Sequence, residues 1–393
     1  MKPLESDVIV IGGGIVGTTT AFFLRRRGVS VRLLERGLTG QQASGVNFGG
    51  IRRQGRALEQ LPLANRALET WRRAVEWLGE DVEFIASGHT RVCYREQDVD
   101  HFLRYAQDAR ACGLDLQVLQ GVALRERFPF LGREVLAASV SPMDGHANPR
   151  LAAPAFGRAA VRLGAELHEN VEVVRVEQEG AGFRVEDKSG RVYRGAQVVV
   201  CTGAWSSRLS AQFGEPVPLE TRGPQMAVTE PVPYVFRSSM GVFTSNKHES
   251  VYFRQIPRGN LILGGGAHGP SNIDTCRAGV LPINTVRQMA QFRRLVPSLA
   301  PLHVIRTWSG VEGYLPDAEP VIGPSEKVAG LFYGFGFSGS GFQIGPGVGE
   351  TLAELISTGN TSIALDTFSI GRFDERTETF SGVVPEASRS QMR

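Results

Sequence analysis

The chain contains few cysteines, and its acidic and basic residues are nearly equal in number. Its 393 residues include only 4 cysteines, which are scattered along the chain without a close pair. This spacing argues against a disulfide framework and against a zinc or iron–sulfur site built from this chain alone. The 43 basic and 40 acidic residues leave a net charge of +3. So small a balance gives no reason to expect a nucleic acid or an anionic membrane as a partner.

Long apolar runs are also missing. Glycine or a charged residue interrupts each hydrophobic stretch well before the ~20 residues that a membrane span needs. The first residues carry Glu5 and Asp7 and lead directly into a strand, so we expect neither a signal peptide nor a transit peptide. With 42% hydrophobic residues the chain can bury a large core. Its length suggests two domains or one large domain, and we expect a cytoplasmic protein.

A glycine-rich motif follows the first apolar run. Residues 7–11 are expected to form a buried parallel strand, followed by a helix over 18–27 and a second strand over 29–34 that ends at Glu35. The glycines of a GxGxxG pattern between strand and helix are Gly12, Gly14 and Gly17. Such glycines let the backbone approach a pyrophosphate, and the acid accepts hydrogen bonds from ribose hydroxyls. The unit predicts dinucleotide binding, and the acid disfavours NADP because it would repel a 2′-phosphate.

The segments that follow favour FAD over NAD. Residues 39–56 form a polar loop of small residues instead of a further βα unit, which suits an extended cofactor that continues towards a flavin. A second buried strand runs into Thr202, Gly203 and Trp205, a second turn of dinucleotide type. The strand over 171–176 is expected to hold the adenine edge at Val174 or a neighbour.

Here the sequence resembles the FAD-dependent amino-acid and amine oxidoreductases of the D-amino-acid oxidase superfamily. It is most similar to sarcosine oxidases and to the β-subunit-like opine, proline and hydroxyproline dehydrogenases. The similarity rests on the turn at 202–205, on residues 308–323 and on the glycine-rich segment 334–350, and it covers roughly residues 5–375. The resemblance implies an α/β fold: a Rossmann-type, glutathione-reductase-like FAD-binding domain with an interleaved antiparallel-sheet substrate domain.

The resemblance also divides the chain. The FAD-binding domain would comprise residues 1–86, 145–215 and 311–380, and the substrate domain would comprise 87–144 and 216–310, with a flexible tail over 381–393. The spacing of apolar residues predicts further elements: a helix over 57–85, a strand over 88–94, a turn over 124–130, and helices over 98–112, 149–163 and 284–295.

The cofactor is expected to be FAD, held without a covalent bond. The position that carries the flavin-linked cysteine in some relatives matches Gly310, and the loop over 39–56 contains no histidine. The glycines of 334–350 would let the backbone approach the flavin, and the helix that they open would direct its positive end at the region that becomes negative on reduction. The residues expected to contact FAD are Gly12, Gly14, Ile15, Val16, Gly17, Glu35, Arg36, Ala43, Ser44, Gly49, Gly50, Val174, Thr202, Gly203, Trp205, Gly310, Gly339, Ser340, Gly341, Phe342 and Gln343.

The expected substrate site centres on Arg52, whose guanidinium would pair with a substrate carboxylate. Tyr252 and Arg254 lie on a strand expected over the flavin, and Gln343 stands where relatives have a carboxylate-binding lysine. The lysine credited with oxygen activation in relatives falls on or near Ile262, which weakens the case for a fast oxidase. Further pocket candidates are Tyr314, His268 and His248. No metal site is expected.

The resemblance implies oxidation of the C–N bond of an amino acid or secondary amine of the sarcosine, D-amino-acid, proline, hydroxyproline or opine type. Hydride transfer to flavin N5 would give an imine that hydrolyses. The electron acceptor stays open between oxygen, a quinone and an electron-transfer subunit of a hetero-oligomer. An alternative is an FAD-dependent dehydrogenase of a 2-hydroxy acid or polyol phosphate. A third possibility is an FAD-binding subunit with little catalysis of its own.

Overall fold

The first lobe is built on the apolar strand that the sequence predicts at residues 7–11. A computed structural model describes residues 4–299 and 302–374. Val8, Ile9 and Val10 are at most 1% exposed, because their strand lies in the middle of the sheet with parallel neighbours on both sides. The order of the sheet is β20-β21-β11-β1-β2-β8, with the β9–β10 hairpin joined to β11. Its strands are β1 (Leu4–Ile11), β2 (Val31–Leu34), β8 (Glu166–His168), β9 (Val173–Glu179), β10 (Gly182–Asp187), β11 (Val192–Val200), β20 (Val321–Pro324) and β21 (Leu331–Phe335).

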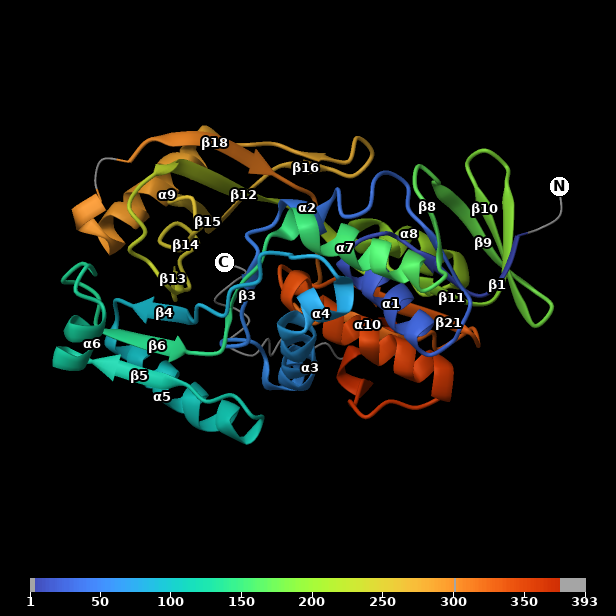
Figure 1. Cartoon of the computed structure of the whole chain (residues 1–393), viewed down its shortest axis with the longest axis horizontal. Coiled ribbons are helices and arrows are strands. Elements are labelled where there is room, and N and C mark those ends of the chain that lie inside the picture. The colour runs from blue at the N-terminus through green and yellow to red at the C-terminus, as the bar shows by residue number, and fades with distance from the viewer. Residues whose placement is uncertain (1–3, 300–301, 375–393) are drawn as a thin grey trace.

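Helices with long buried faces cover this sheet (Figure 1). Helix α1 (Ile15–Arg26) packs between α7 (Pro149–Arg162) and α10 (Gly341–Thr358), and α10 also packs on α3 (Leu61–Arg72). The ten residues Ile15 to Leu24 of α1 are all buried, because the helix lies between the sheet and its neighbours. This packing fixes the start of α1 at the carboxyl end of β1, where a dinucleotide binds in such folds.

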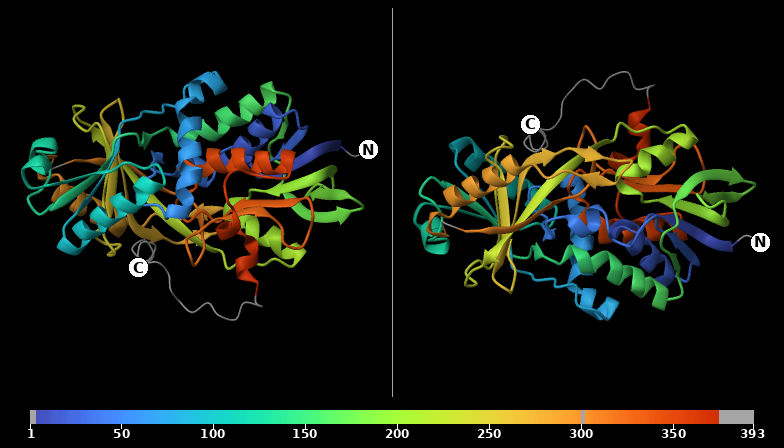
Figure 2. Two further views of the ribbon diagram at one scale, coloured as in Figure 1. Left: turned by 90° about the horizontal axis from the view of Figure 1, so that it is seen from below. Right: turned by 90° about the horizontal axis from the view of Figure 1, so that it is seen from above.

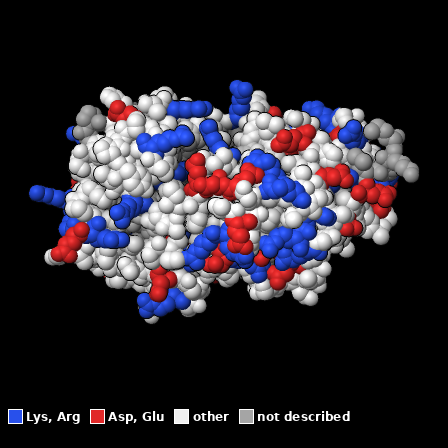
Figure 3. Space-filling model, in the orientation of Figure 1, with Lys and Arg blue, Asp and Glu red and all other residues white. Residues whose placement is uncertain are grey.

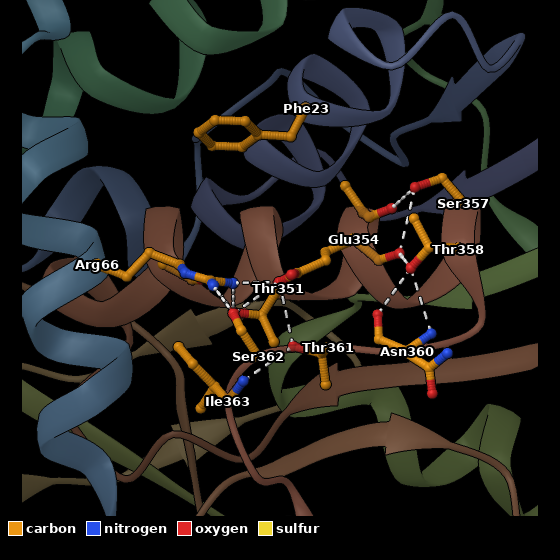
Figure 4. A network of polar contacts seen from close by, with 12 residues as sticks. Phe23, Arg66, Thr351, Glu354, Ser357, Thr358, Asn360, Thr361, Ser362 and Ile363 are labelled. Atoms are coloured by element: carbon orange, nitrogen blue, oxygen red, sulfur yellow. Dashed lines mark hydrogen bonds and ion pairs between the residues drawn. The ribbon is translucent and has the colours of Figure 1, made fainter.

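A polar network holds α3 against α10 at the surface (Figure 4). Nη1 of Arg66 on α3 donates to Thr351 Oγ1 and to Glu354 Oε2 of α10, both at 2.8 Å. Nη2 of the same guanidinium donates to Ser362 Oγ at 2.5 Å, beyond the end of α10. One arginine therefore joins α3, α10 and the segment that follows α10.

The second lobe is a largely antiparallel sheet that lies beside the first (Figure 2). Its order is β18-β12-β15-β14-β13-β4-β6-β5, with β19 also paired to β12, and α9 (Pro282–Leu295) packs against β12, β14 and β15. Its strands are β4 (His89–Cys93), β5 (Gln117–Gln120), β6 (Ala137–Ser141), β12 (Glu220–Pro231), β13 (Ser239–Val242), β14 (Val251–Gln255), β15 (Asn260–Gly269), β18 (Val304–Ser309) and β19 (Glu312–Tyr314). The chain enters this lobe twice. This confirms the predicted fold class of an α/β nucleotide-binding lobe with an interleaved antiparallel sheet.

The predicted division into an FAD-binding and a substrate domain stays a prediction, and the two sheets bear on one of its boundaries. Strand β19 belongs to the second sheet, so that sheet extends past the boundary placed at residue 310. The tail placed at 381–393 lies outside the described residues. The remaining short elements are α2 (Ala43–Val46), β3 (Gly50–Ile51), α4 (Ala74–Leu78), β7 (Gly145–His146), α8 (Ser206–Ser210), β16 (Ser271–Asn272) and β17 (Arg277–Ala278).

Two predicted elements differ from the structure. The helix expected over 57–85 is broken at Arg73 into α3 and α4, and it ends at Gly79, whose φ of 62° terminates α4 in the left-handed conformation. Of the turn expected over 124–130, residues 124–127 are instead the end of helix α6 (Gly121–Arg127), whereas residues 129–130 form a turn as expected. The buried Leu124 anchors α6 to the core of the second lobe, and Pro129 follows its end, where a proline is compatible with a helix stop.

The surface carries charges of both signs, which are interspersed over the face seen in Figure 3. All four cysteines are free thiols. Within residues 4–299 and 302–374, none of the helices combines the length and the apolar composition needed to cross a bilayer.

Candidate active site

The turn between β1 and α1 forms a cradle of backbone groups. Gly12 has a φ of 105°, and an added Cβ there would lie 2.5 Å from the carbonyl oxygen of Cys201. The N–H of Ile15 donates to Ser44 Oγ at 2.9 Å, which brings α2 over the start of α1. Glu35 ends β2 and accepts from the N–H groups of Gly13 at 2.6 Å and Gly37 at 2.7 Å. Its remaining lone pairs face the cavity and suit ribose hydroxyls.

Gly17 contributes to this turn through packing. An added Cβ at Gly17 would collide with the carbonyl oxygen of Gly12. We expect Gly17→Ala to displace the turn and to lower the FAD content of the purified protein at least about tenfold. Flavin absorbance per chain measures this. Gly157→Ala is the matched control, because a Cβ on this glycine of α7 would find its neighbours at 3.4 Å or more. A Gly17→Ala protein with full flavin content would contradict the prediction.

A second edge of the cavity comes from the end of β11. Thr202, Gly203 and Trp205 line it, together with Val174 of β9 and Arg36 after β2. The guanidinium of Arg36 lies 4.2 Å above the Trp205 ring, whose Nε1 donates to the carbonyl of Ile273 at 2.8 Å. These are the residues predicted to surround the ribose-and-adenine end of a bound dinucleotide, and the structure brings them to one wall of the cavity.

The glycine-rich segment before α10 forms a third edge. Gly339, Ser340, Gly341, Phe342 and Gln343 all line the cavity at the N-terminus of α10. The amide of Gln343 is turned away from a substrate position: its Nε2 donates to the carbonyl of Ala64 on α3 at 2.9 Å. Its Oε1 is buried and has no hydrogen-bond partner within the described residues.

These edges enclose a cavity of about 630 Å³ that reaches from the β1–α1 turn into the second lobe. Most of the predicted site residues line it: Gly12, Gly14, Ile15, Val16, Glu35, Arg36, Ala43, Ser44, Gly50, Arg52, Val174, Thr202, Gly203, Trp205, Tyr252, Gly339, Ser340, Gly341, Phe342 and Gln343.

Four of the residues predicted to act in catalysis or to contact FAD lie outside this lining, and so does the pocket candidate His248. Gly17 faces the Gly12 carbonyl, and an added Cβ on Gly310 would collide with Val46, so both glycines permit close packing. Gly49 has a φ of 81° and lies against the Ala147 carbonyl. Arg254 is 7% exposed, and its Nε donates to the carbonyl of Phe48 at 2.7 Å. Arg254 therefore positions the segment before Arg52 and does not reach the cavity.

The end of the cavity in the second lobe carries opposite charges. Arg52 follows β3, and Tyr252 of β14 lies near both Arg52 and Glu312 of β19. The hydroxyl of Tyr314 donates to Glu312 Oε2 at 3.0 Å. The ring of Tyr252 fits against β15 because Gly264 opposite it has no side chain. A zwitterion would find a cation and an anion here, with a tyrosine near both.

Burial shifts the pKa values of these groups. It raises the pKa of Glu312 to about 7, and the hydrogen bond from Tyr314 opposes this change. Burial also lowers the pKa of Arg52, which leaves a guanidinium that is still charged at neutral pH. The pKa of His268 falls to about 4 through burial, with smaller effects from the charges of Arg222 and Lys247. At pH 7 this end of the cavity therefore contains charged arginine, neutral imidazole and a carboxyl group that is half ionised.

Several lining residues were not predicted from the sequence. They include Arg56, His89, Arg91, Lys247 and Glu312. Arg91 lies in a strand whose residues are otherwise mostly buried, and a charged residue in such a strand is the one signal that could have indicated it. Glu312 lies within the segment 308–323 that carries the family resemblance, but no role was assigned to it. Ile262 is not among the lining residues, whereas Tyr314 and His268 are.

A buried ion pair holds the loop that carries Arg52. Asp144 is fully buried and accepts from Arg53 Nε at 2.9 Å, from Arg53 N–H at 2.8 Å and from Gln54 N–H at 3.3 Å. We expect Asp144→Asn to lower the free energy of unfolding by about 3 kcal/mol, because it leaves a buried guanidinium without its counter-charge. Urea unfolding of the holoprotein measures this.

The matched control is Asp115→Asn, which breaks the Arg110–Asp115 pair with its carboxylate 84% exposed. That change should cost less than about 0.5 kcal/mol. Equal losses in the two variants would show that the Asp144 pair does not stabilise the loop.

The first lobe provides a cradle for a dinucleotide, and the second sheet lies at the other end of the same cavity. This combination is typical of one class of flavoprotein. The chain belongs to the DAO family of FAD dependent oxidoreductases, whose model matches residues 7–355. It is therefore an FAD-dependent oxidoreductase, and FAD is its cofactor, as the sequence predicts.

Relatives of the chain span almost its whole length. Glycine oxidase of Geobacillus kaustophilus is 28% identical over 378 residues, which cover 93% of this chain and 97% of that protein. Sarcosine oxidase subunit beta of an Arthrobacter species is 27% identical over 387 residues, with 95% and 92% covered. The crystal structure of L-proline dehydrogenase from P. horikoshii matches with a TM-score of 0.87 and 30% identity, covering 94% of this chain and 98% of that one.

Proposed function

We propose that this enzyme oxidises the C–N bond of an amino acid or secondary amine. The observation that carries the proposal is the continuity of the cavity, which joins the dinucleotide cradle at Gly12 to the charged end at Arg52 and Glu312. Bound FAD supplies the hydride acceptor. The names of the relatives, which include a glycine oxidase, a sarcosine oxidase subunit and a proline dehydrogenase, support an amine as substrate.

The residues of the chain would orient the substrate and remove one proton. Arg52 holds the substrate carboxylate by charge-assisted hydrogen bonds. Glu312 as carboxylate accepts the proton of the substrate ammonium, which leaves a neutral amine whose lone pair forms the C=N bond as hydride leaves the carbon. Tyr252 and Tyr314, both with pKa values raised by burial, stay neutral and donate hydrogen bonds. Water then hydrolyses the imine to a carbonyl compound and an amine.

Anaerobic bleaching of the flavin absorbance tests this function. The panel contains sarcosine, D- and L-proline, hydroxyprolines, D-amino acids, opines and 2-hydroxy acids. Bleaching by an amine, with stoichiometric carbonyl product, is the expected result. Reduction by a hydroxy acid alone would overturn the proposal.

A second candidate is oxidation of a 2-hydroxy acid or polyol phosphate. The observation in its favour is His268, which lines the cavity with its ring 5.3 Å from that of Tyr314. Burial lowers the pKa of His268 to about 4, so its imidazole is neutral at pH 7 but is a weaker base than an exposed histidine. The same panel separates the two candidates.

We further propose that FAD is bound without a covalent link and that reduced FAD reacts slowly with oxygen. Gly310 packs against Val46 and offers no sulfur atom, and Ile262 supplies no cation. Acid precipitation should release all flavin into the supernatant. Reoxidation after bleaching should be faster with a quinone or dye than with air.

The acceptor could also be a partner subunit, since one relative is named as a subunit of sarcosine oxidase. Co-purification of the untagged chain from its natural host would test for a hetero-oligomer with an electron-transfer subunit. A flavin that is reduced by no substrate in the isolated chain would favour such an assembly.

A further inference from the structure

Three arginines line the substrate end of the cavity without an acidic partner. Arg52, Arg56 and Arg91 all face the cavity, and none of them forms an ion pair with a carboxylate of the described part of the chain. The charge of Asp144 raises the pKa values of Arg52 and Arg56, that of Glu319 also raises the pKa of Arg56, and that of Asp98 raises the pKa of Arg91. Its carboxylate, however, already accepts the side chain of Arg53 and two backbone N–H groups. Within the described residues, the three guanidiniums therefore have carboxylates in their surroundings but none in direct contact.

The three side chains come together around one turn. Gly55 has a φ of 70°, and an added Cβ there would collide with Nη1 of Arg91 and lie 3.2 Å from Nη1 of Arg52. Arg56 Nε donates to the carbonyl of Arg52 at 2.9 Å, and its Nη2 donates to the carbonyl of Ser340 at 3.3 Å. Arg91 is held on β4 with its guanidinium 4.6 Å above the Phe243 ring. Two guanidiniums thus converge at Gly55, and the third lies towards α10.

Burial makes this arrangement costly without an anion. Burial, and to a smaller extent the charge of Arg52, lowers the pKa of Arg56 to about 9 and that of Arg91 to about 9. Each group is still charged at neutral pH, so like charges repel inside a poorly solvated cavity. One substrate carboxylate can neutralise one of them. The phosphates of FAD do not account for Arg91, because Arg91 belongs to the second sheet and the dinucleotide cradle belongs to the first (Figure 1).

We propose that the substrate is a dicarboxylic amine, that is, an amino acid that carries a second carboxylate on its side chain or on an N-alkyl group. Arg52 holds the first carboxylate, and Arg91 with Arg56 holds the second. The reaction in this statement rests on the function proposed above, whereas the preference for a dianion rests only on the arginines.

Binding to the oxidised holoenzyme tests the dianion site without turnover. Perturbation of the flavin absorbance gives dissociation constants for succinate, glutarate, butyrate and acetate. We expect the dicarboxylates to bind at least about tenfold more tightly than butyrate, because a second charge-assisted hydrogen-bonded contact forms. Equal affinities for butyrate and glutarate would overturn the proposal.

The variant Arg91→Gln assigns the effect to a residue. It should weaken glutarate binding about tenfold or more and change butyrate binding less than about threefold. Arg91→Lys keeps the charge and should retain part of the preference. Arg293→Gln, at an exposed position of α9, is the control and should change neither. Equal weakening of both ligands by Arg91→Gln would overturn the role of Arg91, and flavin content checks that each variant is folded.

The outcomes separate this inference from the proposed function. Flavin bleaching by amines with no dicarboxylate preference would refute the inference and keep the function. A dicarboxylate preference that depends on Arg91, without bleaching by any amine, would keep the dianion site and refute C–N oxidation.

Discussion

Replacing Arg52 with glutamine is expected to lower kcat/KM for amino-acid substrates about 1,000-fold while the FAD content is unchanged. Arg52 lines the cavity and is buried enough that its pKa is lowered. Glutamine cannot neutralise a carboxylate that has left water, and loss of one partner of a buried charge pair costs about 4 kcal/mol. Because the carboxylate also fixes the position of the α-carbon, both KM and kcat should change.

The choice of substrate gives this prediction its sharpest control. An amine without a carboxylate does not use the guanidinium, so its kcat/KM should change by less than about threefold in Arg52→Gln. Arg150→Gln changes an exposed arginine and should leave both substrates unaffected. If Arg52→Gln lost activity equally with both kinds of amine, or with neither, Arg52 would not be the partner of the carboxylate.

The nucleotide half of the site could be predicted from the sequence because its signals are local. Gly12, Gly14 and Glu35 fall within one strand–turn–helix–strand unit, and the chemistry of pyrophosphate and ribose requires such residues at that spacing. The turn at Thr202 and the segment before α10 are equally short and rich in glycine. In each case one stretch of chain contains both the element and the residues that contact the cavity.

The substrate half could not be predicted in the same way, because pairing between distant strands creates it. Arg91 reaches Arg52 only because β4 pairs with β13 and β6 at the centre of the second sheet. Glu312 lies near Tyr252 through β12, which pairs with both β19 and β15. Nothing in the spacing of residues 91, 252 and 312 along the chain indicates that their side chains share a cavity.

The residues placed outside the lining have a common physical explanation. A glycine is required wherever backbone or a side chain approaches closely, whether or not a ligand is also near. Gly17 makes room for a carbonyl, and Gly310 makes room for Val46. Arg254 and Tyr252 are two residues apart on β14. Because side chains alternate between the two faces of a strand, we expect both to point to the same face. The side chain of Arg254, however, donates a hydrogen bond to the Phe48 carbonyl and does not extend into the cavity.

Replacing Glu312 with glutamine is expected to lower the rate of flavin reduction 100- to 1,000-fold and to change its dependence on pH. Removal of a general base has an effect of about this size. In the wild type, a Glu312 with a pKa of about 7 is a neutral acid below that pH and cannot take the ammonium proton. The rate should therefore rise with pH through about 7 in the wild type, and this limb should be absent in Glu312→Gln.

Single-turnover reduction under anaerobic conditions, measured from pH 5.5 to 9 in steps of about half a unit around the expected midpoint, isolates this step from reoxidation. The titratable or charged groups that interact electrostatically with Glu312 or with its hydrogen-bond partner Tyr314 are Tyr252, Tyr314 itself and Arg222. His268 has a pKa of about 4 and is neutral throughout this pH range. Tyr314→Phe removes the hydrogen bond that holds the pKa of Glu312 down, so the limb should move to higher pH in that variant. A limb that persists near pH 7 in Glu312→Gln would belong to the substrate or to another group. A limb that disappears in Glu312→Gln and moves upward in Tyr314→Phe would identify Glu312 as the acceptor of the amine proton, because a residue with only a structural role would lower the rate at every pH alike.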